Sequence, residues 1–406
     1  MNILFLTDNF YPETNAPAKR TLEHCNEWSR QGHQITIITG APNFPKGKVF
    51  DGYKNKIYQS ELINNLNVKR VWTFITANEG FLLRILDYIS FMISSFFCGI
   101  FTRKHDVIIA TSPQFFTLLS AYFISLIRRT PLVLEIRDLW PESIVAVGAM
   151  KESSWTIKVL HRLAIFLYSR AKMVVCVTKS FKNELIKKGI DTNKIFVVEN
   201  GFNLDNSITP NKSIKEVEKQ YNFKETDFTV SFTGTVGMAH GLDIILKSAK
   251  TIDKKVKFLI IGDGASKSQL LDRAQKQKLN NINFISNISW QEIVNLNQAI
   301  DMHLVHLIDN PEFRKVIPSK IFESMALRKP IIMGVLGESR DIVVKAGCGI
   351  NITPEDHKEL NDVISEYIDK PYVLKEIGEN GYNFLAKNFS RKKLANKMIE
   401  SIKDII

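Results

Sequence analysis

The chain has 406 residues, of which 45% are hydrophobic and 24% are charged, and its formal net charge is +12. This length suits two α/β domains better than one core, and the composition excludes an intrinsically disordered chain. The basic charge comes without zinc-finger spacing, an RNP motif or a basic-aromatic stripe, so a nucleic-acid partner is disfavoured and an anionic membrane surface is favoured.

In the first half of the chain, short apolar runs alternate with amphipathic stretches. The first run, residues 3–7, is typical of a buried strand and not of a signal peptide. The predicted strands are 3–7, 34–39, 68–73, 107–111, 132–136, 173–178 and 195–198. The predicted helices include 14–31, 115–129, 153–170 and 179–188. This alternation predicts a parallel sheet with helices on both faces.

Residues 81–101 are unusually apolar and rich in phenylalanine. Arg84 and Asp87 interrupt them early, and the charge-free remainder is shorter than the ~20 residues of a membrane span. A core helix and a true span stay open as interpretations. We favour a third, in which segment 81–104 dips into the inner leaflet and places Arg103 and Lys104 at the headgroups.

A polar stretch, residues 203–222, is predicted to be a linker because it contains Pro210, many Asn and Lys residues and little apolar periodicity. The strand–helix pattern then restarts, with strands predicted at 228–232, 257–261, 283–285, 302–305, 331–334 and 349–352. We therefore expect two doubly wound domains, 1–202 and 223–385, and a last helix within 386–406 that packs back on the first domain. Ligands of such sheets bind beyond the carboxyl ends of the strands, which predicts a central cleft.

The four cysteines show no paired spacing, so neither a disulfide framework nor a zinc site is predicted, and a reducing cytoplasm is expected. They are Cys25, Cys98, Cys176 and Cys348.

A glycine-rich turn, Thr233-Gly234-Thr235-Val236-Gly237-Met238-Ala239-His240-Gly241, follows the first strand of the second domain and precedes a helix. Glycines let backbone N–H groups approach an anion, and the helix dipole adds to the attraction. A diphosphate site is favoured, and a tight turn without ligand is the alternative. The turn after the first strand of the chain has no glycine, which disfavours a dinucleotide-binding first domain.

A second cluster reads Phe313-Arg314-Lys315-Val316-Ile317-Pro318-Ser319-Lys320-Ile321-Phe322-Glu323-Ser324-Met325-Ala326. Ser319 is predicted to cap a helix that begins at Lys320, where a cation opposes the helix dipole. A bound diphosphate would remove that conflict, and a surface ion pair with Glu323 is the alternative. Because no D-x-D pair occurs, we expect no metal and a diphosphate held by Arg, Lys and backbone N–H groups.

Together with Asn200-Gly201-Phe202-Asn203, Ile261-Gly262-Asp263-Gly264 and Lys329-Pro330-Ile331-Ile332, these motifs resemble glycosyltransferase family 4, retaining enzymes of the GT-B fold. Arg137-Asp138-Leu139-Trp140-Pro141-Glu142-Ser143 makes the likeness closest to the bacterial subgroup that builds O-antigen and capsule units. The resemblance implies two Rossmann-like domains that face a cleft. It also implies transfer from a UDP-sugar, an N-acetylated hexosamine or deoxyhexosamine, to a saccharide on undecaprenyl diphosphate at the inner face of the cell membrane.

The resemblance also assigns roles. Glu323 matches the second glutamate of the family's E-x7-E motif, which binds the donor ribose, whereas Lys315 stands where the first glutamate would be. The family's usual Arg and Lys in the glycine-rich turn are absent, so Arg314 and Lys320 are expected to contact the phosphates. The expected catalytic residues are Asp138, Arg314 and Lys320; the donor-binding residues are Gly234, Gly237, His240, Gly262, Gly264, Ile288, Ser319 and Glu323; and the acceptor-side residues are Glu13, Arg20 and Arg137.

Several alternatives remain open. Arg137 and Asp138 could form a strand-end ion pair, and Asn200 and Gly201 a plain turn. A UDP-sugar 2-epimerase can use the same fold, although it would not need a lipid-facing segment. A membrane-associated binding protein without catalysis is the third class.

Overall fold

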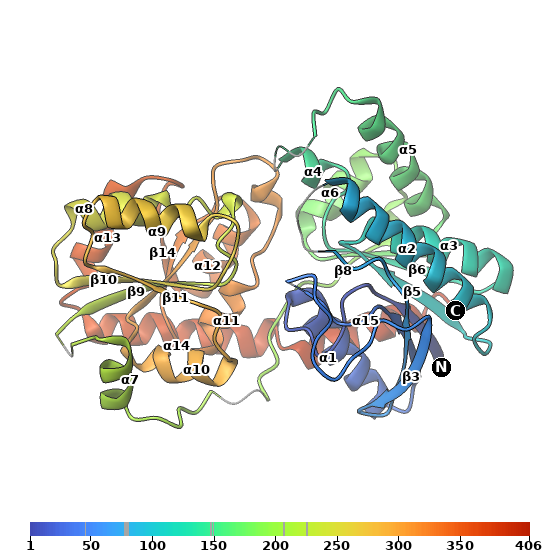
Figure 1. Ribbon diagram of the computed structural model, residues 1–406, viewed down its shortest axis with the longest axis horizontal. Coiled ribbons are helices and arrows are strands. Elements are labelled where there is room, and N and C mark those ends of the chain that lie inside the picture. Colours follow the sequence, from blue (N-terminus) through green and yellow to red (C-terminus); the bar gives the residue numbers. More distant parts are fainter. Residues whose placement is uncertain (45, 77–80, 147, 149, 206–207, 225) are drawn as a thin grey trace. The chain divides into compact units, whose positions relative to one another are not determined.

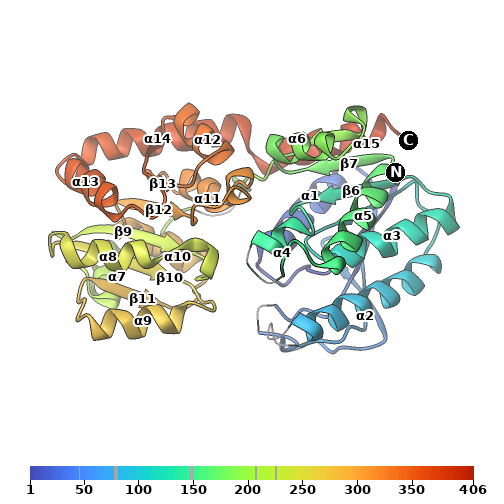
Figure 2. The same cartoon turned by 90° about the horizontal axis from the view of Figure 1, so that it is seen from above.

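The computed structural model describes residues 1–406 except 45, 77–80, 147, 149, 206–207 and 225. The chain divides into two compact units, of which unit 1 comprises Met1–Asn200 and Arg391–Ile406 and unit 2 comprises Gly201–Ser390. Each unit has one sheet with helices on both faces (Figures 1 and 2). The predicted fold class, two doubly wound α/β domains, is confirmed.

Unit 1 is built on an eight-stranded sheet of order β3-β4-β2-β1-β5-β6-β7-β8. Its strands are β1 (Asn2–Leu6), β2 (Gln34–Thr39), β3 (Tyr58–Ile63), β4 (Leu66–Val71), β5 (Val107–Thr111), β6 (Leu132–Ile136), β7 (Met173–Cys176) and β8 (Ile195–Val197). Its helices are α1 (Ala16–Arg30), α2 (Phe81–Ile100), α3 (Phe115–Arg128), α4 (Glu142–Ala146), α5 (Trp155–Arg170), α6 (Lys179–Lys187), the 3-10 helix η1 (Thr192–Lys194) and α15 (Arg391–Lys403). Strands β5, β6 and β7 are wholly buried, as their continuous apolar runs predict.

Strand β3 was not predicted. It pairs antiparallel with β4, and Asn64 and Asn65, with φ of 49° and 66°, form the turn between them. Its residues alternate between exposed and half-buried positions because β3 lies at the sheet edge. An edge strand of this kind has no continuous apolar run, which is the signal that revealed the other strands.

The last helix, α15, packs on α1 within unit 1. The Trp28 indole N–H donates to the carbonyl of Ala395 at 2.9 Å, and the Arg391 guanidinium pairs with Glu23 at 2.7 Å. Leu394 and Met398 are buried in the same core. The chain therefore returns to unit 1 after completing unit 2.

Unit 2 is built on a six-stranded parallel sheet of order β11-β10-β9-β12-β13-β14. Its strands are β9 (Phe228–Thr233), β10 (Val256–Ile261), β11 (Ile282–Ile285), β12 (Met302–His306), β13 (Ile331–Gly334) and β14 (Gly349–Asn351). Its helices are α7 (Ile214–Tyr221), η2 (Met238–His240), α8 (Asp243–Thr251), α9 (Lys267–Lys276), α10 (Trp290–Leu296), η3 (Asn297–Ala299), η4 (Phe313–Lys315), α11 (Lys320–Ala326), α12 (Glu338–Ala346), α13 (His357–Tyr367) and α14 (Pro371–Asn388). Helices α8, α9 and α13 cover one face of this sheet, and α7, α10, α11 and α14 cover the other (Figure 1).

The predicted linker, 203–222, contains a helix and belongs to unit 2, so that part of the prediction is wrong. Helix α7 begins with a capping box in which Ser213 and Glu216 bond each other's backbone N–H groups. Val217 is fully buried beside Leu259 and Leu296. Only one side of this short helix contacts the core, which is why its sequence looks polar throughout.

Candidate active site

Two glycine turns meet at the carboxyl ends of β9 and β10. The backbone N–H of Gly234 donates to Ile261 at 2.8 Å, and that of Val236 donates to Asp263 at 3.0 Å. A Cβ atom added at Gly262 would lie 2.0 Å from the Gly234 carbonyl oxygen, and one at Gly264 would lie 2.4 Å from that of Val236. Glycine is therefore required at 262 and 264 so that the two backbones can touch.

The Lys320 side chain lies against this double turn. Its Nζ is 4.2 Å from the centroid of the Phe232 ring, and a Cβ added at Gly234 would lie 2.6 Å from its Cε. Burial lowers the pKa of Lys320 to about 8, although Glu323 opposes the shift. Within the described part of the chain no carboxylate forms an ion pair with Lys320. A partly buried ammonium without a counter-ion favours an anionic ligand.

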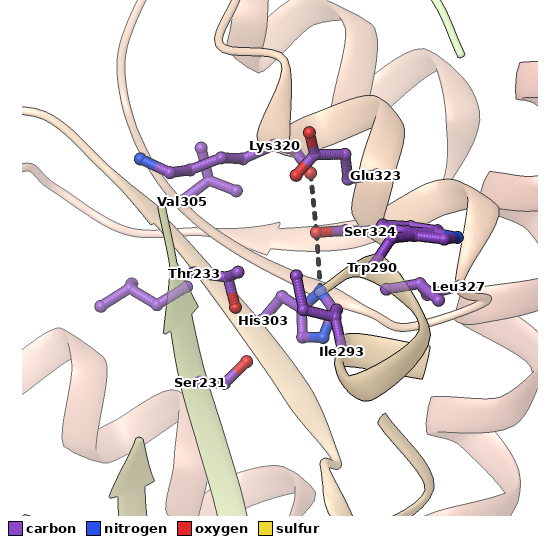
Figure 3. A pocket seen from close by; sticks show the side chains of 11 residues that line it. Ser231, Thr233, Trp290, Ile293, His303, Val305, Lys320, Glu323, Ser324 and Leu327 are labelled. Atoms are coloured by element: carbon purple, nitrogen blue, oxygen red, sulfur yellow. Dashed lines mark hydrogen bonds between the residues drawn. The ribbon is translucent and has the colours of Figure 1, made fainter. Parts of the chain in front are cut away.

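A cavity of about 20 Å³ lies beneath Lys320, enough for one water molecule (Figure 3). Its lining residues are Ser231, Thr233, Trp290, Ile293, His303, Leu304, Val305, Lys320, Glu323, Ser324 and Leu327. The Ser324 hydroxyl donates to the Lys320 carbonyl at 2.8 Å and accepts from His303 Nδ1 at 2.8 Å. Burial lowers the pKa of His303 to about 3, so this imidazole is neutral and can hold the first turn of α11 in place.

His303, Ser324 and Trp290 were not predicted as site residues. The sequence carries one usable signal, since Ser324 stands four residues after Lys320 on the same helix face. Nothing in the sequence connects His303 to that helix, because β12 and α11 meet only in the folded unit.

His240 lies edge-on to the Phe232 ring, with 5.3 Å between the centroids. Burial and the nearby Lys320 lower the pKa of His240 to about 3, and its buried Nδ1 has no hydrogen-bond partner. His306 donates from Nδ1 to the His240 carbonyl at 2.7 Å and accepts the Glu355 N–H at Nε2, at 2.8 Å. His306 therefore positions the turn, and the buried Nδ1 of His240 lies without a hydrogen-bond partner in the same turn.

The other expected donor residues lie around this turn. Gly237 precedes η2, and Ile288 packs on the core after β11. Helix α11 begins at Lys320 as predicted, but Ser319 has helical φ and ψ and makes no side-chain capping bond, so the predicted cap is wrong. Glu323 lines the same cavity as Lys320, and the surface ion pair between them is not formed.

Arg314 lies in η4, and its Nη2 pairs with Asp309 Oδ1 at 2.7 Å. The guanidinium is half exposed and does not line the cavity beneath Lys320. In this structure Asp309 neutralises Arg314, so a diphosphate would have to compete with that carboxylate.

In unit 1, Arg137 and Asp138 follow β6. The Ser112 hydroxyl accepts the backbone N–H of Arg137 at 2.7 Å and that of Asp138 at 3.4 Å. Burial lowers the pKa of Arg137 to about 10 and raises the pKa of Asp138. In the described residues the two side chains form no ion pair, and Arg137 Nη1 is buried without a hydrogen-bond partner. The strand end therefore presents groups that lack internal partners.

Arg20 is only 1% exposed. Its Nε donates to Glu135 at 2.8 Å, its Nη1 to the carbonyl of Glu199 at 2.7 Å and its Nη2 to that of Val198 at 3.0 Å. These bonds tie α1 to β6 and to the segment after β8, which gives Arg20 a structural role in unit 1.

An acidic cluster lies at the carboxyl end of β1, and it joins Glu13, a predicted acceptor-side residue, to Asp8 and Asp87, which were not predicted. Burial and neighbouring carboxylates raise the pKa of Asp8, and burial raises that of Asp87 to about 6. Glu13 has a raised pKa because of burial, although its Oε1 accepts the N–H groups of Asn43 and Phe44 at 2.8 and 2.9 Å. A carboxyl group with a pKa of about 6, such as that of Asp87, can exchange a proton with a hydroxyl group near neutral pH. Among the described residues no group of His, Cys, Asp and Glu has the arrangement of a metal site.

Two Rossmann-like units, one with a cation on a glycine turn at its strand ends, have the architecture of the GT-B class of glycosyltransferases. Residues 18–206 match the model of Glycosyltransferase Family 4, and residues 213–384 match that of Glycosyl transferases group 1. The chain belongs to glycosyltransferase family 4 and is a transferase.

Two curated relatives illustrate the similarity. The chain is 25% identical to the putative colanic acid biosynthesis glycosyl transferase WcaI of Escherichia coli, over 80% of this chain and 81% of the relative. It is 26% identical to the probable glycosyltransferase WbjE of Pseudomonas aeruginosa, over 71% and 72%.

Solved structures show the same fold. HepE of Anabaena, in complex with UDP and glucose, has a TM-score of 0.75 at 18% identity and covers 99% of both chains. Sucrose-phosphate synthase of Thermosynechococcus elongatus has a TM-score of 0.78 at 12% identity and covers 100% of this chain and 98% of its own.

Proposed function

We propose that the protein transfers a sugar, an N-acetylated hexosamine or deoxyhexosamine, from a UDP-sugar to a saccharide on undecaprenyl diphosphate, with retention of configuration, in surface polysaccharide synthesis. The observation that carries the proposal is the Lys320 ammonium, which lies on the glycine turn of β9 and forms no ion pair with a carboxylate of the described chain. HepE, with the same fold, was solved with UDP, and WcaI is named for colanic acid biosynthesis.

In the proposed chemistry, an acceptor hydroxyl oxygen forms a bond to the anomeric carbon on the same face from which the diphosphate departs. The bond between the sugar and the diphosphate breaks, negative charge grows on the departing phosphate, and the proton of the acceptor hydroxyl passes to that phosphate. Lys320 would donate to that phosphate, and the glycine turn lets backbone N–H groups approach it. Glu323, one turn along α11, would bind the donor ribose. Arg314 would join the site by leaving Asp309 for the diphosphate.

The test is a product assay with a set of UDP-sugars, run with and without a lipid-linked saccharide acceptor. Acceptor-dependent transfer supports the proposal. Isomerisation of the UDP-sugar without acceptor would identify an epimerase instead, and failure to bind UDP would identify a protein without this catalysis.

The affinity for UDP is expected to fall as pH rises through about 8. Lys320 loses its positive charge at that pH because its pKa is lowered from the ordinary lysine value of 10.5. We expect the dissociation constant to rise about tenfold or more between pH 7.5 and 9.5. Calorimetric titration with UDP across this range measures it. The Lys320→Arg variant keeps its charge over this range, so its dissociation constant for UDP should change little with pH. The same pH dependence as in the wild type would show that another group titrates.

We also propose that segment 81–104 contacts the inner face of the membrane together with the exposed side of α3. Helix α2 is long and apolar enough to cross a membrane by length and composition, and only 17% of its window Leu83–Ile100 is buried. The helix packs on α3 through a narrow stripe, where Ser95 and Ser120 share a hydrogen bond of 2.8 Å and Phe91 is fully buried. Large apolar side chains elsewhere on α2 and α3 remain exposed, namely Leu83, Leu86, Ile93, Phe97, Phe123, Leu126 and Ile127. Such a surface is larger than the fold needs.

Flotation with anionic liposomes tests this contact. Replacing Leu126 and Ile127 of α3 together by Ser is expected to weaken binding about tenfold or more, because both side chains are more than half exposed and would enter the lipid. Val344→Ser, at an equally exposed position in unit 2, is the control and should float like the wild type. Equal flotation of the double variant would contradict the contact.

A further inference from the structure

A groove of about 410 Å³ lies between α2 and the β3–β4 hairpin in unit 1. Its lining residues are Ile57, Tyr58, Lys69, Val71, Ile93, Ser94, Phe97, Cys98 and Phe101. This volume is within the range of small-molecule sites, ~300–1,000 Å³. It is far larger than the cavity beneath Lys320, which holds about 20 Å³.

The groove is apolar, and its rim stays uncovered. Three of the lining side chains are exposed: Ile57 is 86% exposed, Phe101 is 83% exposed and Phe97 is more than half exposed. Exposed apolar side chains around a hollow are typical of a site that receives an apolar ligand. Helix α2 also forms the proposed membrane contact, so a groove beside it would be close to lipid. A hydrocarbon chain is therefore the apolar ligand that we expect there.

One cation stands in this lining. Lys69 Nζ lies 3.3 Å from the Tyr58 hydroxyl and 5.5 Å from the centroid of that ring. Across the described ranges, no carboxylate forms an ion pair with Lys69. Arg103 and Lys104 follow two residues after the end of α2 and are both exposed. An apolar groove whose lining holds the Lys69 ammonium matches an amphiphile whose head is a phosphate.

We propose that this groove binds part of the isoprenoid chain of a polyprenyl phosphate, with Lys69 at the phosphate. The proposal rests on the proposed function, since it assigns a place in unit 1 to the lipid of the acceptor. A single groove takes a single chain, so a one-chain isoprenoid fits it better than a two-chain phospholipid. Helix α2 and the β3–β4 hairpin form the walls of the groove, and their aromatic and branched side chains suit a methyl-branched ligand.

The wild-type chain offers a reporter for this site. Cys98 lines the groove and is partly exposed, whereas Cys25, Cys176 and Cys348 are buried. Alkylation by N-ethylmaleimide should therefore label Cys98 first. We expect farnesyl phosphate, used below its micelle concentration, to slow this labelling about tenfold at saturation, when about nine sites in ten are occupied. Dihexanoyl phosphatidylglycerol at the same concentration should protect far less.

Variants locate the site by calorimetric titration with farnesyl phosphate. Ser94→Trp places a large ring in the groove and should weaken binding at least about tenfold. Lys69→Gln should weaken binding of farnesyl phosphate about fivefold or more and leave binding of farnesol unchanged. Leu62→Ser, on β3 but outside the lining, is the matched control and should bind like the wild type.

Wild-type affinity in Ser94→Trp, or equal protection of Cys98 by the phospholipid, would overturn the proposal. UDP binding by each variant is measured in parallel. If UDP binds and farnesyl phosphate does not protect Cys98, the groove proposal fails and the proposed donor site stands. If farnesyl phosphate binds and UDP does not, the proposed function fails and the groove stands as a lipid site.

Discussion

Replacing Lys320 by Met is expected to lower the rate of sugar transfer about 100-fold, the usual loss when one donor to a developing negative charge is removed. Lys320 is partly buried on the Phe232 ring, and no carboxylate of the described chain forms an ion pair with it. Met has a similar length and packs well on an aromatic ring, so unit 2 should keep its fold. Turnover at saturating UDP-sugar measures the effect.

Lys276→Met is the control for a lost positive charge. Lys276 lies on α9, is 74% exposed at its side chain and pairs with Asp272 on the surface. The Lys276→Met variant should have unchanged turnover. The Lys320→Arg variant should retain more activity than Lys320→Met because arginine keeps the positive charge. Equal rates for Lys320→Met and the wild type would remove Lys320 from the reaction.

Replacing Gly262 by Ala is expected to destabilise unit 2 by about 3 kcal/mol and to lower its unfolding midpoint by roughly 6–12 °C. The new Cβ would lie 2.0 Å from the Gly234 carbonyl oxygen, and the φ of Gly262 is +139°. Both atoms belong to rigid strand ends, so the two turns would have to separate. Thermal unfolding by calorimetry measures the shift, and UDP binding should be lost with the turn.

Gly347→Ala is the matched control in the same unit. Gly347 also has a positive φ, +57°, but its nearest neighbour is a side-chain nitrogen of Asn380 at 3.7 Å from the added Cβ. The backbone conformation alone should cost about 1 kcal/mol, or roughly 2–4 °C. If Gly262→Ala costs no more than Gly347→Ala, the close approach of the two turns is not a source of stability.

The fold was predictable where strands are buried on both faces. Strands β2, β5, β6 and β13 begin and end where the apolar runs do, since neither face of a central parallel strand meets water. The same reasoning misses β3 and α7. Strand β3 lies at an edge, and α7 contacts the core on one side only, so neither has a long apolar run.

The candidate site was predictable where local chemistry conflicts with local structure. Lys320 at the start of α11 opposes the helix dipole, and that conflict identified it from sequence. The partners that hold it were not predictable. His303 and Ser324 meet across 21 residues, and His306 meets His240 across 66, because strand ends come together only when the sheet forms. The pairing of Arg314 with Asp309 was not predictable either, although the two residues are close in sequence. It depends on a local turn that the sequence pattern does not determine.

The central claim is that Lys320 and the glycine turn of β9 hold the diphosphate of the donor. A crystal structure of the full chain with UDP tests it most directly. The account predicts phosphate oxygens within ~3 Å of Lys320 Nζ and against the backbone of Gly234 or Gly237. UDP bound elsewhere, with the Lys320 ammonium still on the Phe232 ring and away from phosphate, would contradict it.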